Sequence, residues 1–185
     1  MDFFRMGILT PDLEYTIKDI KKTIPDRLSN IARGISSALF FSNNIRQNVI
    51  AETIFVKGDN CIVIQFHGDR LRRVSPDERS VSMFLIKAKK HAEQSERTNG
   101  WYNEGISFQK TLFTQYIQNL PEDYVINKNG KIKKYISHTI LHIIDGFNVN
   151  KINKGHQISK CEINNPAYFF AIINWIIDRN FMDIR

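Results

Sequence analysis

The sequence is poor in cysteine and has no long apolar run. Only two cysteines, Cys61 and Cys161, occur in its 185 residues, and they form no CxxC pair. This predicts free thiols and an intracellular protein rather than a disulfide-linked scaffold. No apolar run approaches the roughly 18 residues that a membrane-spanning helix requires. The N-terminal stretch Met1–Leu9 carries charged residues and lacks the layout of a signal peptide. We therefore expect a cytoplasmic protein without a membrane segment.

The composition is that of one folded domain with a basic character. Hydrophobic residues make up 42 % of the chain and aromatic residues 11 %, which argues against disorder. A chain of 185 residues can bury a core as a single domain spanning residues 1–185. The net charge of +7 favours a polyanionic partner. Many basic proteins bind no nucleic acid, however, so the placement of the charges matters more than their sum.

Short β-rich runs alternate with helical stretches along the chain, which predicts an α/β fold. Phe3–Leu9 is expected to form a strand that ends at a Thr-Pro-Asp turn. Apolar residues at helical spacing predict a helix over Arg27–Phe41. Two β-branched runs, Val49–Val56 and Cys61–Phe66, are separated by a short polar connection that contains glycine. The connection between these two runs is expected to be a hairpin turn or another short link.

The sequence pattern in the middle of the chain predicts two further helices. Ser75-Pro76-Asp77-Glu78 has the S-x-x-E pattern of a capping box, with proline at the first helical position. In the helix that it opens, three lysines are expected to lie on the surface: Lys87, Lys89 and Lys90. Residues 93–105 are polar and are expected to form a loop. Ser107 is then expected to cap a helix with apolar positions from Phe108 to Leu120.

The C-terminal part ends in an unusually apolar helix. Tyr135–Ile144 is expected to form a strand, and a shorter strand is expected near Gln157–Ser159. Asn165 and Pro166 have the residue types of an N-cap and a first helical residue. The helix that follows is apolar nearly all round and must therefore be covered on every side. At the end of a small domain the second cover is expected to be another subunit, so the helix predicts a homodimer.

The stretch Ile35–Ala88 resembles the N-terminal half of the TrmY family of tRNA pseudouridine-N1-methyltransferases. Three pieces carry the resemblance: AxFxSxxIRxxV from Ala38, a hydrophobic-x-F-x-G ending at Gly68, and VSPDER before an amphipathic helix. The resemblance implies a SPOUT-type α/β fold, in which a sheet is flanked by helices and a C-terminal deep trefoil knot binds S-adenosyl-L-methionine. It also implies a homodimer that forms through the C-terminal helix. The N-terminal half would face the RNA, and roughly residues 120–185 would form the knotted cofactor-binding region.

The C-terminal half matches the family more loosely, and the cofactor contacts rest on this match. Ile126 falls at a cofactor-contacting leucine of the family, and Gly146 lies in the expected glycine-containing cofactor loop. A third segment occupies the place of the loop before the knotted helix, and its expected contacts are Ile158, Ser159, Lys160, Cys161 and Ile163. This chain lacks the family's second glycine after Gly146 and its helix cysteine, which is replaced by phenylalanine. Main-chain contacts to the adenine could survive both changes.

The resemblance implies N1-methylation of a pseudouridine in the T-loop of tRNA. One alternative is methylation of a ribosomal RNA pseudouridine, as in the related Emg/Nep-type enzymes. Another is a catalytically silent RNA-binding or assembly protein with an altered cofactor loop. The VSPDER and SxxIRxxV pieces favour the tRNA branch.

A few charged residues are candidates for the reaction and for RNA contact. Asp77 is the acid–base candidate, although its carboxylate could simply stabilise the positive end of a helix. The RNA-binding candidates are arginines, whose planar guanidinium binds phosphate in two places: Arg46, Arg70, Arg72, Arg73 and Arg79. The alternative for such a charge run is an ordinary solvated face.

A metal site is not expected. His138 and His142 have the i, i+4 spacing of helical metal ligands, but they lie in a run that predicts a strand. Cys161 has no apparent base and is not expected to act as a nucleophile. Phe40, Phe41 and Trp175 are expected in the core or an interface rather than as base-stacking residues.

Overall fold

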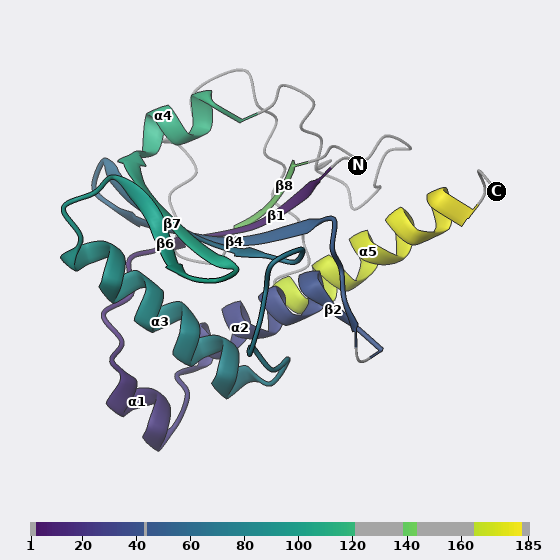
Figure 1. Cartoon of the computed structure of the whole chain (residues 1–185), viewed down its shortest axis with the longest axis horizontal. Coiled ribbons are helices and arrows are strands. Elements are labelled where there is room, and N and C mark those ends of the chain that lie inside the picture. Colours follow the sequence, from purple (N-terminus) through teal and green to yellow (C-terminus); the bar gives the residue numbers. More distant parts are fainter. Residues whose placement is uncertain (1–2, 43, 121–138, 144–164, 183–185) are drawn as a thin grey trace.

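The protein is built on a mixed six-stranded sheet with helices on both faces (Figure 1). The computed structural model describes residues 3–42, 44–120, 139–143 and 165–182. The strand order in the sheet is β6-β7-β5-β4-β1-β8. This arrangement confirms the expected α/β class with a sheet flanked by helices. Residues 121–138 and 144–164, which make up most of the expected knot, lie outside the described residues, so the knot stays a prediction.

The centre of the sheet is parallel and its other half is antiparallel. β1 (Phe4–Pro11) lies between β4 (Val49–Lys57) and β8 (Thr139–Ile143) and runs parallel to both. β5 (Asn60–His67) pairs antiparallel with β4, so the expected short connection is a hairpin turn. β7 (Ile106–Leu112) pairs with β5, and β6 (Asn99–Asn103) closes that side of the sheet as an edge strand.

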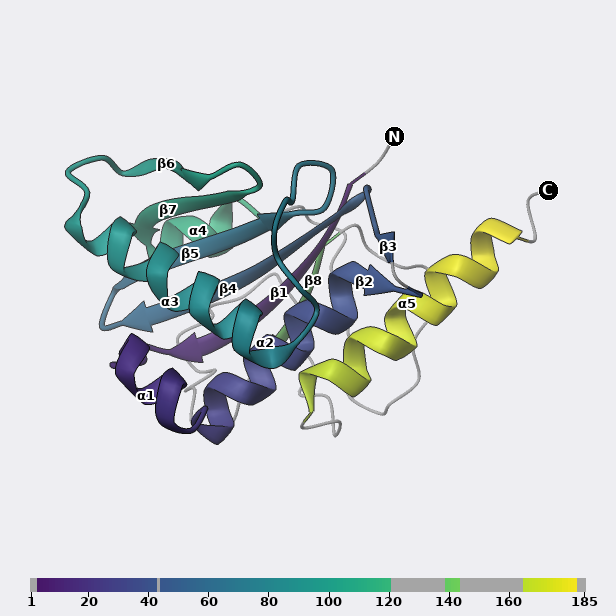
Figure 2. The same ribbon diagram turned by 60° about the horizontal axis from the view of Figure 1, so that its bottom comes forward.

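Most helices cover one face of the sheet. α2 (Asp26–Leu39) contacts α3 (Glu78–Gln94) and α5 (Pro166–Met182), and the short α1 (Ile17–Lys22) contacts α3 (Figure 2). A two-stranded ribbon of β2 (Phe40–Phe41) and β3 (Asn44–Ile45) follows α2. The main core lies between these helices and the sheet. None of the described helices is long and apolar enough to cross a membrane.

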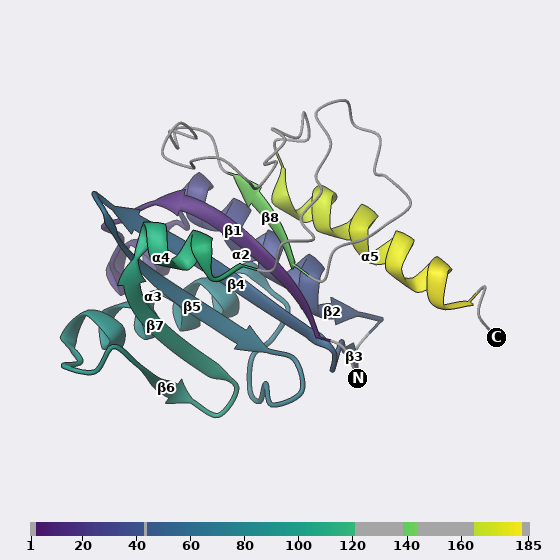
Figure 3. The same ribbon diagram turned by 90° about the horizontal axis from the view of Figure 1, so that it is seen from above.

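A smaller helix, α4 (Phe113–Gln118), covers part of the opposite face of the sheet (Figure 3). Its buried side chains Phe113, Tyr116 and Ile117 pack against residues of β4, β5 and β1. Because successive strand residues point to opposite faces, Met6 and Ile8 belong to the main core whereas Leu9 belongs to this second one. The second core covers the middle of the sheet, next to the parallel strands.

The prediction for residues 93–120 was wrong over its first half. Residues 99–103 form β6 instead of a loop, and Ser107 lies in β7 instead of capping a helix. The helix begins only at Phe113. Phe108, Leu112 and Tyr116 are four residues apart, which imitates a helical face. In the structure β7 pairs with β5 on one side and with β6 on the other. This pairing between strands overrides the helical spacing of the apolar residues.

The start of α3 also differs from the prediction. The N-cap is Asp77 rather than Ser75, and its side chain accepts a hydrogen bond from the Ser80 N–H at 2.8 Å. Glu78 completes no capping box at this helix. Its carboxylate instead accepts hydrogen bonds from the Ser29 hydroxyl and the Arg33 Nε, both at 2.5 Å. The sequence pattern located the helix correctly, but Glu78 ties α3 to α2.

The predicted start of α5 is confirmed. The Asn165 side chain accepts a hydrogen bond from the Ala167 N–H at 2.9 Å, and Pro166 is the first helical residue. Within the helix, the Asn174 amide donates to the Ser37 carbonyl of α2 at 2.6 Å. Tyr168 and Trp175 point outward and are 62 % and 60 % exposed. The helix is therefore buried along one side only in the single chain.

Candidate functional site

Three of the five arginines that the sequence singles out come together in the segment between β5 and α3. This segment begins as a turn, because the N–H groups of Arg70 and Leu71 both donate to the His67 carbonyl. Leu71 and Val74 are buried and hold the segment against the core. The side chains of Arg70, Arg72 and Arg73 are exposed beside them. We call residues 70–73 the arginine turn.

The arginine turn borders a hollow of about 610 Å³. The hollow is lined by Arg72, Arg73, Phe84, Asn103 and Glu104. Its cationic wall comes from the arginine turn, and its other wall comes from the end of β6 and the residue that follows. A phosphate group could reach both guanidinium groups from solvent there, since neither arginine forms an ion pair with a described residue.

Close packing fixes the position of the arginine turn. Gly105 lies between β6 and β7 with a φ of +94°, and a Cβ atom there would come within 2.5 Å of the Leu71 Cα. Arg73 itself has a φ of 60°, a left-handed conformation that is uncommon for a residue with a side chain. The backbone is thus held in one path by contact with the β6–β7 connection.

Arg79 and Arg46 lie apart from the arginine turn. Arg79 projects from the first turn of α3 and donates to the Lys21 carbonyl of α1 at 3.2 Å. Arg46 makes a bidentate pair with Asp178 of α5, and both N–O distances are 2.7 Å. The Arg46 side chain is only 13 % exposed, and its guanidinium also lies over the Phe41 ring. This geometry gives Arg46 a part in fastening α5.

The carboxylate of Asp77 is already occupied by helix capping. Hydrogen bonds from Ser75 and from the backbone of Ser80 lower the pKa of Asp77 below its usual value. A lower pKa makes a carboxylate a weaker proton acceptor at neutral pH. Capping of α3 accounts for the presence of a carboxylate at this position. The contacts of Asp77 with the described residues do not point to a role in binding a substrate.

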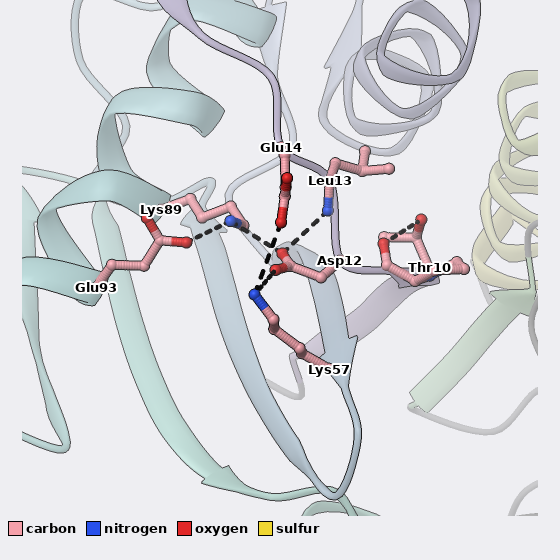
Figure 4. A network of polar contacts seen from close by, with 8 residues as sticks. Thr10, Asp12, Leu13, Glu14, Lys57, Lys89 and Glu93 are labelled. Atoms are coloured by element: carbon pink, nitrogen blue, oxygen red, sulfur yellow. Dashed lines mark hydrogen bonds and ion pairs between the residues drawn. The ribbon is translucent and has the colours of Figure 1, made fainter.

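The carboxyl ends of the parallel strands form a second polar region. β1 and β4 end there, and the residues that follow line a hollow of about 670 Å³ together with α1 and α3. Lys89 of α3 is buried, although the sequence predicted a surface position, and this prediction was wrong. Its ammonium lies 2.9 Å from the Asp12 carboxylate and also binds Glu93, while Lys57 approaches Asp12 to 3.9 Å (Figure 4).

The ion pairs of Lys89 decide its charge state. Burial alone would lower the pKa of Lys89, but hydrogen bonds to Glu93 and Asp12 outweigh burial and raise the pKa above its usual value. The side chain is only 7 % exposed, so its charge depends on these carboxylates. Asp12, Lys89 and Glu93 are thus paired with one another, whereas Arg72 and Arg73 of the arginine turn have no ion-pair partner among the described residues.

A row of hydrogen-bonded polar side chains crosses the sheet on the face that α4 partly covers. We call Glu52, Gln65, Ser107 and His67 the polar row. Glu52 of β4 is fully buried and accepts hydrogen bonds from Tyr116 Oη at 2.6 Å and from Gln65 Nε2 at 2.9 Å. Gln65 Oε1 accepts from the Ser107 hydroxyl at 3.2 Å, and that hydroxyl lies 2.7 Å from His67 Nε2. Burial lowers the pKa of His67 below its usual value, and the positive charges of Arg70 and Arg5 act in the same direction, whereas the negative charges of Asp69 and Glu52 oppose it. The lowered pKa favours the neutral imidazole at pH 7.

The sequence reasoning did not identify this polar row, although one signal was visible. Glu52 is the only charged residue between Val49 and Val56, within a run that is otherwise suited to a buried strand. A buried carboxylate in such a run must find donors on neighbouring strands. Nearby Cys61 is a free thiol whose pKa is raised to about 12, chiefly by burial, so it stays protonated.

The expected cofactor contacts lie outside the described residues. These are Ile126, Gly146, Ile158, Ser159, Lys160, Cys161 and Ile163. The structure does describe β8, which ends at Ile143 beside the carboxyl end of β1. Open α/β sheets bind ligands at the carboxyl ends of parallel strands. β8 therefore ends at the edge of the sheet where folds of this kind bind ligands.

The histidine pair of the predicted strand is only half described. His142 is buried and packs against Phe169 and Phe170, with ring centroids 5.2 and 6.4 Å apart. His138 falls outside the described residues. Among the residues that the structure does describe, no group of histidine, cysteine and acidic side chains could hold a metal ion.

Comparisons with known proteins point to one family. Residues 14–140 match a family model described as "Putative SAM-dependent RNA methyltransferase". Among curated proteins, the tRNA (pseudouridine(54)-N(1))-methyltransferase of Methanococcus maripaludis strain C5 is 33 % identical over 122 residues. The alignment covers 64 % of this chain and 61 % of that protein.

Two further relatives carry the same name. The Methanocaldococcus jannaschii protein is 30 % identical over 115 residues, covering 57 % of this chain and 56 % of the relative. The Haloferax volcanii protein is 30 % identical over 118 residues, covering 63 % and 57 %. The matches to these relatives thus span about three-fifths of their length. The arginine turn, Asp77 and the polar row all lie inside the matched residues 14–140.

Proposed function

The chain belongs to the SAM-dependent RNA methyltransferase family whose model it matches, and we propose that it methylates N1 of a pseudouridine in the T-loop of tRNA. The observation that carries this proposal is the position of the arginine turn. It is an exposed cationic segment on a rigid scaffold, and it lies within the matched residues. The names of the relatives support tRNA over ribosomal RNA as the substrate.

The arginine turn would bind the phosphate backbone and so position the RNA. Arg72 and Arg73 are exposed beside a hollow and can each donate two hydrogen bonds to a phosphate. Placing a base and a methyl donor in line supplies much of the rate advantage in a bimolecular reaction. Because Asp77 caps α3, the proposal assigns no proton transfer to it.

S-adenosyl-L-methionine would be held by the segments that include Ile126, Gly146 and residues 158–163, within the proposed cofactor-binding region of residues 120–185. When bound, it supplies a methyl group on a positively charged sulfur. In the overall reaction the S–CH₃ bond breaks, an N1–CH₃ bond forms, and the N1 proton leaves to solvent. The knot is part of this proposal, as is a single domain that extends over residues 1–185.

We further propose that α5 forms the contact between two copies of the chain. Tyr168 and Trp175 present large, exposed rings on the side of α5 that faces away from α2. Sedimentation at micromolar concentration is expected to give a species of twice 21.6 kDa. Replacing both aromatic residues by serine should yield the single chain. A wild-type protein that sediments as one chain would contradict the dimer.

Methyl transfer is tested with labelled S-adenosyl-L-methionine and two tRNAs. One tRNA carries pseudouridine in the T-loop and the other carries uridine at that position. Label is expected in the first tRNA alone. In uridine the N1 atom forms the glycosidic bond and carries no hydrogen, so it cannot be methylated there. Label in the second tRNA would therefore report methylation at another position.

Other outcomes of this assay would identify the alternatives. Labelling of small-subunit ribosomal RNA but not tRNA would point to the ribosomal substrate. Absence of label in every RNA, together with no thermal stabilisation by S-adenosyl-L-methionine, would point to a silent RNA-binding protein.

A further inference from the structure

The buried polar row ends at an exposed tryptophan on the edge of the sheet. Glu52 pairs with Gln65 across β4 and β5, Gln65 pairs with Ser107 across β5 and β7, and Ser107 pairs with Trp101 across β7 and β6. These four residues are direct cross-strand neighbours, so their side chains share one face of the sheet. The row starts in the core at Glu52, which is 0 % exposed, and ends at Trp101, which is 48 % exposed.

The hydrogen bonds along this row can run in only one direction. Gln65 Nε2 donates to the Glu52 carboxylate, so the NH₂ group of the Gln65 side chain faces Glu52. The Gln65 carbonyl oxygen then faces Ser107 and takes the single hydroxyl hydrogen. Ser107 has only its lone pairs left for His67, so His67 must carry its hydrogen on Nε2. The buried carboxylate thereby fixes the tautomer of a half-buried histidine.

This tautomer leaves Nδ1 of His67 as a hydrogen-bond acceptor. Nδ1 makes no hydrogen bond to any residue that the structure describes. The imidazole lies against the Trp101 ring, with centroids 4.8 Å apart. The Arg70 guanidinium lies 5.4 Å from the Trp101 ring centroid and has Asp69 as a partner at 3.4 Å. An aromatic ring, a cation and a neutral acceptor thus lie together beside the arginine turn.

We propose that Trp101, Arg70 and His67 form a subsite for one unpaired base of the bound RNA. The base would stack on the exposed part of the indole ring, and His67 Nδ1 would accept a hydrogen bond from a base N–H or a ribose hydroxyl. This inference rests on the proposed RNA substrate and adds the recognition of a single-stranded nucleotide. Double-stranded RNA cannot satisfy it, because its bases are already stacked within the helix.

Charge and position favour RNA as the occupant. Arg70 belongs to the same short segment as Arg72 and Arg73, so the cation beside Trp101 and the two arginines that border the hollow come from one continuous segment of the chain. Proteins that bind single strands combine these two elements, a cationic track and aromatic rings beside it. An aromatic residue that served the core alone would be buried, as Phe108 on the same strand pair is.

The test uses the fluorescence of Trp101. The chain has two tryptophans, so Trp175→Phe leaves Trp101 as the sole indole. This protein is titrated, without S-adenosyl-L-methionine, with a T-arm hairpin RNA and with a fully paired RNA duplex of the same length. The hairpin loop is expected to quench Trp101 emission, whereas the duplex is expected to bind without quenching.

Variants separate stacking from charge. Trp101→Ala should weaken hairpin binding by about tenfold, in line with the loss of one stacked base, and leave duplex binding nearly unchanged. Trp101→Phe keeps an aromatic ring and should retain most of the affinity. The salt dependence of binding should be unchanged in Trp101→Ala, but its slope should fall by about 1 or more when Arg72 and Arg73 are both replaced by alanine. His67→Phe keeps a ring against Trp101 but removes the acceptor, and it should also weaken hairpin binding.

Equal quenching by hairpin and duplex, or equal loss of affinity for both in Trp101→Ala, would overturn the subsite. If Trp101→Ala does not fold, the quenching of Trp101 itself still decides the question. The outcome is independent of methyl transfer. A protein that labels tRNA without quenching loses only this subsite, and a protein that quenches without labelling loses only the proposed activity.

Discussion

Replacing Lys89 by methionine is expected to destabilise the protein by about 3 kcal/mol, because it breaks a buried ion pair. Methionine keeps the apolar stem of lysine and removes only the charge. The Asp12 carboxylate, 17 % exposed, would lose its closest cation and keep only Lys57 at 3.9 Å. A carboxylate left without its partner in a buried place costs more than the ion pair contributes when intact.

Chemical denaturation with urea measures this effect, and the neighbouring lysine provides the control. Lys90 is exposed on the same helix, so Lys90→Met should change the free energy of unfolding by no more than about 0.5 kcal/mol. The raised pKa of Lys89 adds a dependence on pH. The stabilisation is complete below the unfolded pKa of 10.5 and is lost as pH rises through the higher folded value. Equal destabilisation by the two variants would show that the ion pair contributes nothing specific.

Gly105→Ala is expected to destabilise the protein by about 3 kcal/mol and to weaken RNA binding. The left-handed backbone at this residue costs an alanine about 1–2 kcal/mol. The added Cβ would come within 2.5 Å of the Leu71 Cα, and overpacking of this kind costs about 1–3 kcal/mol more. Since the obstacle is backbone, relief of the clash requires the arginine turn to move.

Gly58→Ala is the matched control for this variant. Gly58 also has a positive φ, +62°, but a Cβ there would meet nothing within 4 Å. Its replacement should cost only about 1 kcal/mol and leave RNA affinity unchanged. Thermal unfolding and RNA titration of both variants separate the two contributions. Wild-type RNA affinity in a folded Gly105→Ala protein would contradict the dependence of RNA binding on the position of the turn.

The elements that the sequence predicted well are those with local signals. The β4–β5 hairpin is set by two β-branched runs around a glycine turn, and α5 is set by Asn165 and Pro166. β6 and β7 could not be predicted in this way, because their local pattern suits a helix and only pairing with β5 decides the outcome. Lys89 follows Leu85 by four residues, so it shares the buried side of α3, and helical spacing alone could have placed it there.

The same distinction applies to the candidate site. Arg70, Arg72 and Arg73 are nearly consecutive, so the sequence was sufficient to group them. Arg46 was grouped with them because it is an arginine in a shared motif, but its partner Asp178 lies at the other end of the chain. Trp101 lies near Arg70 because of the position of β6 in the sheet. The spacing of residues along the sequence does not indicate this contact.

The order of strands in the sheet has a consequence for protein synthesis. β6, β7, β5, β4 and β1 are all encoded before residue 113, and the last neighbour of β1 is β8, from residues 139–143. A nascent chain can therefore complete most of the sheet while one edge of β1 has no partner. An open strand edge can pair with another chain and start aggregation. A chain that ends near residue 120 would lack β8, so this edge of β1 would be without the partner that it has in the structure.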